Sequence, residues 1–451
     1  MHSQGLRRRL SLLQATAINM TDMVGIGPFI TLPMVIMMMN GPYFLYAWIA
    51  GAILSVLDAM IWSELGAALP RAGGSFNFLK EAYGRDGAGK LMSFLFVWQT
   101  MIQAPLVIAS AAIAFSKYFS FLVPLSPLLS KILSGSVVIL IIILLYRKIE
   151  SIGKISIFMC AGVLITLLWI IGGGIAHGHF LEPIRHINEG IVLNYGFITA
   201  IGFASVKTVY SYLGYYNVCH LGGEIINPSR NIPRSMFISI FTIALLYLLM
   251  NISITSVIPW QTARSSEFVV SIFIRQLMGN GAAQVITCLI LWVAFASVFS
   301  ATLGYSRIPY AAAEDGAFFG VFKKLHPSKG FPHISLLFLG GLGFIFSLLF
   351  RLSEVISAIL AMRILIQFIG QGIGLILLRR KKSLDLPFKM PLYPLPALIA
   401  MAMWLFVLIS TGRELVLLGL GIISLGILVY LIRAKWGKEW PFSKKELFVD
   451  A

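Results

Sequence analysis

Two glycines and a proline interrupt the first long apolar stretch of this chain, which reads MVGIGPF from Met23 to Phe29. Pro28 cannot continue a helix that comes from before it, but it suits the first turn of a new helix. We therefore expect one helix to end near Val24, an extended segment at Gly25–Gly27, and a second helix from Pro28 onward. Free backbone N–H groups at the start of that second helix would attract a carboxylate.

A second interruption falls in the sixth apolar stretch, where residues 210–216 read YSYLGYY around Gly214. A glycine in a membrane helix can simply permit close packing, and a proline can simply kink the helix. Interruptions at corresponding places in the two halves of a chain instead point to the binding site of a transporter. Carbonyl groups left free at the end of the sixth half-helix would attract an ammonium group. A site with both features suits an amino acid.

Four ionisable side chains fall well inside apolar stretches: Asp22, Asp58, Lys207 and Arg363. An unpaired charge at the centre of a bilayer costs at least about 2.5 kcal/mol, so each of them needs a partner or water. Two acids and two bases allow two buried ion pairs. The alternative is that they act in gating or coupling, with Asp22 and Lys207 lining a cavity because each lies within a turn of an interruption. Asp22 is the better candidate for carrying a proton.

Two further polar side chains follow Arg363 at helical spacing in the tenth stretch. Arg363, Gln367 and Gln371 form one polar stripe, which should face the protein interior or a water path. Ser297 and Ser300 in the eighth stretch are candidates for binding sodium, although serine is also common in membrane helices as packing filler. We find no metal-ligand or cofactor pattern, and the three cysteines have no disulfide or metal spacing.

The elements that position these residues are long apolar segments. Of the 451 residues, 58% are apolar and only 12% are charged. A membrane span needs roughly 20 apolar residues, and backbone in lipid must satisfy its own hydrogen bonds, so the segments should be helices. The sequence therefore predicts an all-α membrane protein with about twelve spans. They are expected near residues 10–38, 42–69, 90–119, 132–147, 152–176, 190–221, 233–258, 268–303, 332–350, 353–378, 391–411 and 415–434.

The net charge of +17 needs an explanation, because it would also suit a nucleic-acid partner. Most of the 35 Lys and Arg residues fall in the two terminal segments and in the loops expected on the same side of the membrane. This is the positive-inside bias of membrane proteins. It predicts that both termini are cytoplasmic and that no nucleic acid is bound. The compact length and short termini suggest the inner membrane of a bacterial cell.

Four motifs in this order resemble those of the amino acid–polyamine–organocation superfamily, and are closest to the L-type amino acid transporters and their bacterial relatives. They are Glu64-Leu65 with PRAGGSFNF at 70–78, EIINPSRNIP at 224–233, the loop from Ser306-Arg307 to Gly316, and LPFKMPLYP at 386–394. The resemblance implies one domain over residues 1–451, with two inverted five-helix repeats at about 10–176 and 190–379. Two further helices at about 391–434 follow, and helices 1 and 6 are broken.

The same resemblance implies which groups hold the substrate. The α-carboxylate would bind the amides of Gly25, Ile26 and Gly27, and Tyr210 would close over the substrate. The α-amine would bind carbonyls near Met23, Tyr210, Ser211 and Leu213, beside Gly214. The chain departs from the family at three points. Ile26 stands where a serine is usual, Pro28 replaces a usual aliphatic residue, and Ala161-Gly162 stand where some proton-coupled relatives have a lysine.

The resemblance thus implies a permease that moves neutral or acidic L-amino acids by alternating access, coupled to a proton or to sodium. Two alternatives remain open: a polyamine or organic-cation transporter of the same fold, or a transporter-like amino acid receptor. An enzyme is not expected, because the sequence has no P-loop, nucleophile elbow or zinc-protease motif. The resemblance also raises the question of a single-span glycoprotein partner, which L-type relatives bind through a cysteine in the external loop between helices 3 and 4. Residues 117–131, which form the corresponding loop, contain no cysteine, so a disulfide-linked subunit is not expected.

Overall fold

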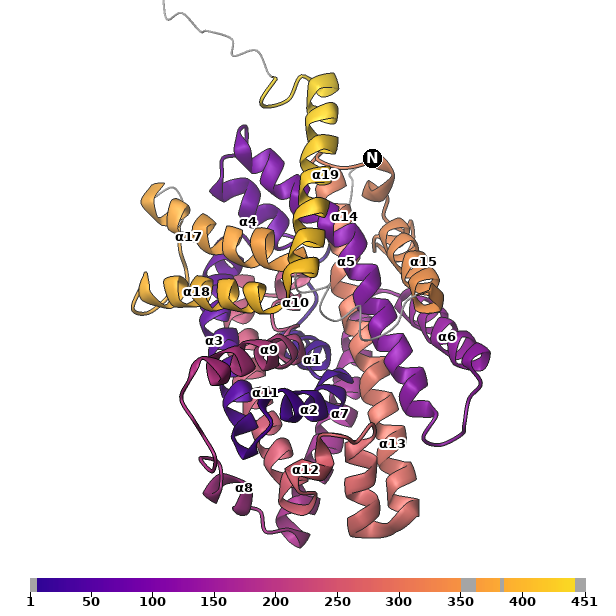
Figure 1. Cartoon of the computed structure of the whole chain (residues 1–451). Coiled ribbons are helices and arrows are strands. Elements are labelled where there is room, and N and C mark those ends of the chain that lie inside the picture. Colours follow the sequence, from indigo (N-terminus) through magenta and orange to yellow (C-terminus); the bar gives the residue numbers. More distant parts are fainter. Residues whose placement is uncertain (1–5, 350–361, 382–384, 443–451) are drawn as a thin grey trace, which may run out of the picture.

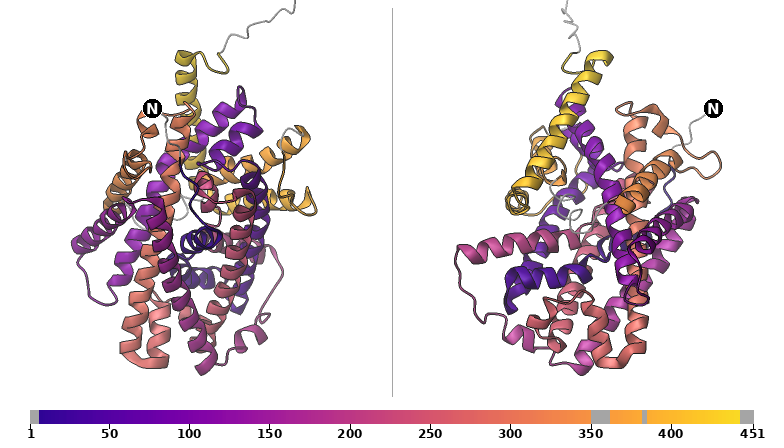
Figure 2. Two further views of the ribbon diagram at one scale, coloured as in Figure 1. Left: turned by 180° about the vertical axis from the view of Figure 1, so that it is seen from behind. Right: turned by 45° about the vertical axis from the view of Figure 1, so that its right-hand side comes forward.

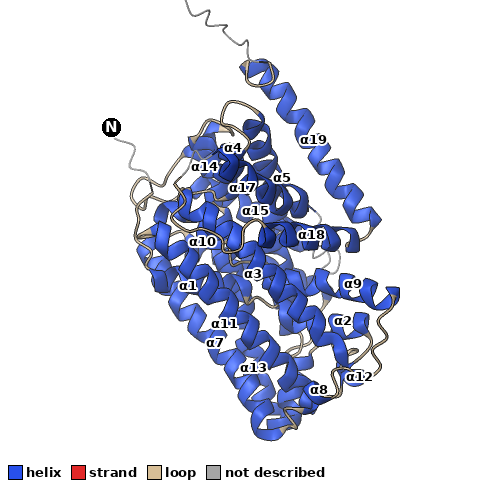
Figure 3. Cartoon of the chain, turned by 90° about the vertical axis from the view of Figure 1, so that its left-hand side faces the viewer, coloured by secondary structure: helices blue, strands red, loops and turns tan. Residues whose placement is uncertain are grey.

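A computed structural model describes residues 6–349, 362–381 and 385–442. In this part of the chain nearly every element is a helix, and the only β pairing consists of two isolated bridges (Figures 1 and 3). The helices are α1 (Leu12–Met23), α2 (Gly27–Met39), α3 (Leu45–Ala68), α4 (Ser75–Ala82), α5 (Ala88–Phe119), α6 (Pro127–Leu145), α7 (Ile149–His177), α8 (Glu182–Arg185), α9 (Tyr195–Tyr212), α10 (Asn217–His220), α11 (Pro228–Val257), α12 (Trp260–Ala263), α13 (Val269–Tyr305), α14 (Arg307–Glu314), α15 (His333–Leu349), α17 (Gly370–Lys381), α18 (Leu395–Ser410) and α19 (Arg413–Gly437). A π-helical turn, Ile364–Ile369, leads into α17.

Seven of the described helices are long and apolar enough to cross a membrane, where the short helical segments that adjoin α3 and α13 are counted with them. They are α3, α5, α6, α7, α11, α13 and α19, and the bent pair formed by α1 and α2 would make an eighth span. This confirms a helical protein that crosses the membrane several times. Twelve crossings remain a prediction, because α15 and α18 are shorter apolar helices and residues 353–361 of the expected tenth span lie outside the described part.

The first predicted interruption is present. α1 ends at Met23, and the chain bends at Val24, which has φ −90° and ψ 76°. α2 then starts at Gly27 with Pro28 in its first turn, one residue earlier than expected. The two helices meet at an angle of 42°. The non-helical segment is therefore Val24–Ile26. Pro28 fits directly after it, because the first N–H groups of a helix have no partner within the helix and proline has no N–H to leave unpaired.

The second interruption is present as well. α9 ends at Tyr212, Leu213 is extended, and Gly214 has a φ of +122° that L-residues with side chains rarely adopt. A Cβ atom on Gly214 would lie 2.7 Å from both the carbonyl carbon of Asp22 and the amide nitrogen of Met23. The two interruptions are therefore in contact, and glycine is what allows the approach. The chain resumes a helix only in the four residues of α10.

The interrupted helices lie at the centre of the bundle, and longer helices surround them (Figure 1). α1 packs against α7, α11 and α13, and α2 packs against α9. α6 and α15 pack together on one flank, where the views of Figures 1 and 2 agree. α19 runs along the outside (Figure 3), and many of its apolar side chains are exposed. Exposed apolar side chains on outer helices are expected of a protein whose solvent is lipid.

Both described ends of the chain lie at the same end of the bundle, which we call the terminal end (Figure 1). Buried ion pairs join the sequence motifs there. Arg307 holds Glu224 with two hydrogen bonds, from Nε at 2.9 Å and from Nη2 at 3.0 Å, and both side chains are fully buried. Arg379 holds Glu64 in the same way at 2.5 and 2.6 Å, and the N–H of Met390 donates to the same carboxylate.

The amino-terminal segment is attached at this point. The N–H groups of Arg9 and Leu10 donate to the carbonyl of Glu224 at 2.8 and 2.9 Å, and the N–H of Ile226 donates back to Leu10. Leu10 and Ile225 form a parallel bridge. The chain start is thus bound to the segment that follows the second interruption, beside the ion pair of Glu224 with Arg307.

Replacing Arg307 by Met should destabilise the fold by about 3–5 kcal/mol, because the Glu224 carboxylate would stay buried without its partner. The midpoint of thermal unfolding in detergent measures this loss. Replacing both residues by Met should recover most of it, since a buried ion pair and an apolar pair of similar volume differ little in stability. An Arg307→Met midpoint equal to that of the wild type would contradict the structural role of the pair.

Candidate functional site

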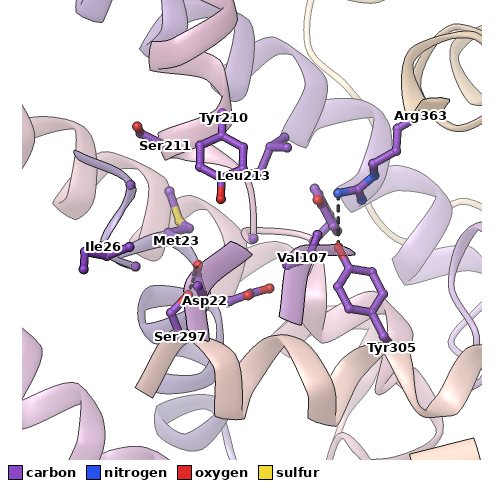
Figure 4. A pocket seen from close by; sticks show the side chains of 15 residues that line it. Asp22, Met23, Ile26, Val107, Tyr210, Ser211, Leu213, Ser297, Tyr305 and Arg363 are labelled. Carbon is purple, nitrogen blue, oxygen red and sulfur yellow. Dashed lines mark hydrogen bonds between the residues drawn. The ribbon is translucent and has the colours of Figure 1, made fainter. Parts of the chain in front are cut away.

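A pocket lies between the two interruptions and contains about 540 Å³ of space free of protein atoms, its opening included (Figure 4). All eight residues that the sequence analysis placed around a substrate line it: Met23, Gly25, Ile26, Gly27, Tyr210, Ser211, Leu213 and Gly214. Seven other residues complete the lining: Asp22, Val107, Ala111, Tyr216, Ser297, Tyr305 and Arg363. The structure thus brings the predicted residues together, while their binding roles stay predictions.

The first interruption supplies the donors of this pocket. Within the described part of the chain, no hydrogen bond is donated by the backbone N–H of Gly25, Ile26 or Gly27. Buried backbone N–H groups are almost always paired, so three successive free groups in a pocket wall mark a place for an acceptor. They also form the start of α2, where the helix dipole favours negative charge. A carboxylate satisfies both conditions.

The second interruption supplies acceptors, and a tyrosine that sequence reasoning missed holds the two segments together. The buried Tyr247 hydroxyl on α11 lies 2.8 Å from the carbonyl oxygen of Met23 and 3.2 Å from that of Ser211, so it can donate to either. α9 ends at Tyr212, so Leu213 is the first residue after the helix. Carbonyls at such a helix end carry partial negative charge, which suits an ammonium group.

Tyr210 lies between the interruptions and α5. A Cβ atom on Gly27 would be 3.4 Å from the Tyr210 ring, so the ring passes close to the first interruption. The Tyr210 hydroxyl is 3.2 Å from the hydroxyl of Ser110. The Ser211 hydroxyl instead bonds Thr31 of α2 at 2.9 Å. These contacts fix the wall of the pocket opposite Asp22 and Ser297 (Figure 4).

The charged groups are not arranged as two ion pairs. Among the described residues, neither Asp22 nor Asp58 forms an ion pair within 4 Å of Arg363. Asp58 accepts hydrogen bonds from Tyr215 at 2.5 Å and Trp404 at 3.1 Å, and it lies outside the pocket lining. Aromatic donors rather than a base therefore stabilise this buried carboxylate.

Arg363 lines the end of the pocket next to Tyr305 (Figure 4). Its Nε donates to Gln367 at 2.7 Å and its Nη1 to Tyr305 at 3.1 Å, and its guanidinium lies 4.9 Å from the ring centre of Tyr216. Within the described chain its Nη2 is buried and has no hydrogen-bond partner. One donor group of a buried cation is thus left for an acceptor.

Of the remaining predicted residues, some are where the sequence placed them and others are not. The polar stripe of Arg363, Gln367 and Gln371 is buried as expected, and Gln371 accepts from Ser75 at 2.6 Å. Lys207 on α9 is not part of the pocket lining.

Of the two predicted sodium ligands, only Ser297 lines the pocket, where its hydroxyl is 3.5 Å from the carbonyl oxygen of Asp22. The Ser300 hydroxyl instead bonds Thr21 at 2.5 Å.

Comparison with known proteins gives one consistent result. The family model described as "Amino acid permease" matches residues 10–425. The chain is similar to the serine/threonine exchanger SteT of Bacillus subtilis (strain 168), with 26% identity over 91% of this chain and 93% of that protein. It is similar to the human Asc-type amino acid transporter 1, with 26% identity over 96% and 82% of the two chains. The human cystine/glutamate transporter is 25% identical over 96% and 87%.

Proposed function

Because this chain belongs to the amino acid permease family, within the amino acid–polyamine–organocation superfamily, we propose that it carries neutral or acidic L-amino acids across the membrane by alternating access. Members of this family and the relatives named above are transporters, not enzymes. The resemblance to L-type transporters and their bacterial relatives is confirmed by the matches to SteT and to the Asc-type transporter.

The observation that carries the proposal is the set of three N–H groups at Gly25–Gly27 that donate to no group in the described part of the chain, in a pocket shared with the second interruption. These donors bind the α-carboxylate, and the carbonyls at the end of α9 bind the α-amine. An α-amino acid is the small molecule that carries both groups on one carbon atom. The pocket therefore recognises the part of the substrate that all amino acids share.

Selection among amino acids then depends on the far end of the pocket, where Arg363 and Tyr305 lie. The free Nη2 of Arg363 favours a substrate whose side chain ends in an oxygen acceptor. A carboxylate forms the stronger, charge-assisted bond, so acidic side chains should bind better than carboxamides, and carboxamides better than aliphatic chains.

Counterflow in proteoliposomes tests transport itself. Vesicles loaded with unlabelled amino acid should accumulate labelled amino acid, whereas a receptor on this scaffold would bind label without accumulating it. Competition by glutamate, glutamine, leucine, arginine and putrescine in the same sample then ranks the substrates. Displacement by putrescine alone would replace the proposal with the polyamine or organic-cation alternative.

We propose Asp22 as the group that couples transport to protons, because it lines the pocket and the lysine of proton-coupled relatives is absent from Ala161-Gly162. Uptake by the wild type should rise as the external pH falls, since protonation of the carboxylate precedes the inward step. In Asp22→Asn the uptake should lose this dependence on pH. Uptake measured from pH 5 to pH 8 checks this, and an unchanged profile in the variant would exclude Asp22 as the proton carrier. If Asp22→Asn keeps the profile and wild-type uptake follows sodium, Ser297 and Ser300 become the sites to vary.

We further propose that the whole chain acts as one transport unit, with repeats over about 10–176 and 190–379 followed by the helices of 391–434. Both termini would lie in the cytoplasm of a cell whose plasma or inner membrane holds the protein. The excess of basic residues at the terminal end supports this orientation. No disulfide-linked subunit is proposed, since residues 117–131 contain no cysteine.

A further inference from the structure

A groove at the terminal end of the bundle lies away from the substrate pocket and combines two kinds of side chain. It lies between the end of α6 and the start of α15, and contains about 1120 Å³ of space free of protein atoms, its open side included. Ile142 and Ile143 of α6 and Leu337 of α15 form its apolar wall. Ile143 is 59% exposed and Leu337 is 45% exposed. The groove therefore opens toward the lipid that surrounds these two helices.

Basic residues occupy the rim of this groove. Arg147 and Lys148, in the link between α6 and α7, are exposed, and Lys329 lies opposite them in the loop before α15. None of the described residues that line the groove is acidic. Arg9 forms an ion pair with Glu150 at 3.6 Å, and Glu150 is only two residues from Lys148, so the rim lies beside the amino-terminal segment. Because that segment precedes the first span, the rim is at the level where the spans leave the membrane.

One basic residue of the rim, Lys329, is held in place before any ligand binds. Lys329 donates to the carbonyl of Tyr146 at 2.7 Å, and its ammonium group lies 4.8 Å from the Tyr146 ring centre. The same ring packs edge-on against His326 and Phe331, with centroids 5.2 and 5.0 Å apart. The Lys329 side chain is therefore already ordered before a ligand binds, which lowers the conformational entropy lost on binding.

We propose that this groove binds one anionic phospholipid, with its phosphate between Arg147, Lys148 and Lys329 and an acyl chain along Ile143 and Leu337. The three cations on the rim match the phosphate of such a lipid, and the apolar, lipid-facing wall matches its acyl chain. A neutral phospholipid would fill the wall but leave the cations without an opposite charge. Basic pockets between helices at a membrane surface are known to recognise anionic headgroups in this way.

Native mass spectrometry of the full chain in detergent, titrated with a phosphatidylglycerol or with a phosphatidylcholine of the same acyl chains, tests this proposal. Phosphatidylglycerol should bind more tightly than phosphatidylcholine. In the variant R147Q/K148Q its affinity should fall by about 25-fold, since each basic residue at a surface contributes roughly fivefold. The affinity for phosphatidylcholine should stay unchanged. Both side chains are exposed, so the variant should keep its fold.

The variant K154Q/K435Q is the matched control, because it removes two exposed basic residues outside the groove. It should bind phosphatidylglycerol as the wild type does. Equal affinity of the wild type for the two lipids would overturn the proposal, and so would equal losses in the two variants. Competition by millimolar inorganic phosphate would show a simple anion site instead, which also overturns it. None of these outcomes depends on whether the chain transports amino acids.

Discussion

Replacing Gly214 by Ala should reduce amino acid uptake by about a hundredfold or more. The new Cβ would lie 2.7 Å from backbone atoms of Asp22 and Met23, and the residue would have to keep a φ of +122°. A strained φ of this kind costs roughly 1–3 kcal/mol and overpacking of a core a similar amount. Backbone atoms cannot rotate out of the way as a side chain can, so the two interruptions must separate. Initial uptake rates in proteoliposomes measure the loss.

Gly412 provides the matched control for this prediction. It also has a positive φ, of +96°, but a Cβ there would meet nothing within 4 Å. Gly412→Ala should therefore show only the cost of the backbone strain, while uptake stays within a few-fold of the wild type. If Gly214→Ala transports as well as Gly412→Ala, close contact between the interruptions is not needed for function, and the pocket described above is not the transport site.

Replacing Arg363 by Gln should raise the concentration of glutamate that half-saturates uptake by about 30-fold or more, while the value for leucine changes by less than about threefold. Losing one partner of a buried charged hydrogen bond typically weakens binding by roughly 2–5 kcal/mol. Leucine has no group that reaches this donor. The ratio of the two half-saturation values is the measurement, because it cancels a general change of the pocket that weakens both substrates equally.

Arg380 provides the control here, since it lies on the same helix segment but is exposed and outside the pocket. Arg380→Gln should leave both half-saturation values unchanged. Equal losses for glutamate and leucine in Arg363→Gln would show that Arg363 supports the pocket without selecting its substrate. Arg363→Lys should give an intermediate ratio, because an ammonium group keeps the charge but loses the planar fork.

The interruptions could be predicted from the sequence because glycine and proline act on their own backbone. Pro28 ends any helix that comes from before it, and Gly214 permits a φ that other residues avoid, whatever surrounds them. The start of α2 was therefore misplaced by only one residue. The residues that flank these two points then had to line the gap between them, and they do.

The rest of the pocket could not be found in this way. Val107, Ala111 and Tyr305 come from long apolar helices in which inward-facing and lipid-facing positions have similar composition, so periodicity alone does not separate them. Tyr247 is one tyrosine in such a helix, and only its place between two carbonyls distinguishes it.

The partners of the buried charges were also beyond sequence reasoning. Asp58 accepts from Tyr215 and Trp404, and Arg363 donates to Gln367 and Tyr305, so within the described part of the chain these two charges do not pair with each other. Which neutral donor or acceptor a buried charge finds depends on how distant helices pack. The stripe of Arg363, Gln367 and Gln371 was an exception, because helical spacing alone placed it on one face.

The attachment of Leu10 to Ile225 has a practical meaning for observing the protein at work. If the segment around Ile225 moves when substrate is released, the first residues of the chain must either move with it or lose their backbone hydrogen bonds to it. Arg8 and Arg230 are both exposed on the two sides of this junction. A pair of spectroscopic labels at these positions would follow each turnover in real time, at a place remote from the substrate.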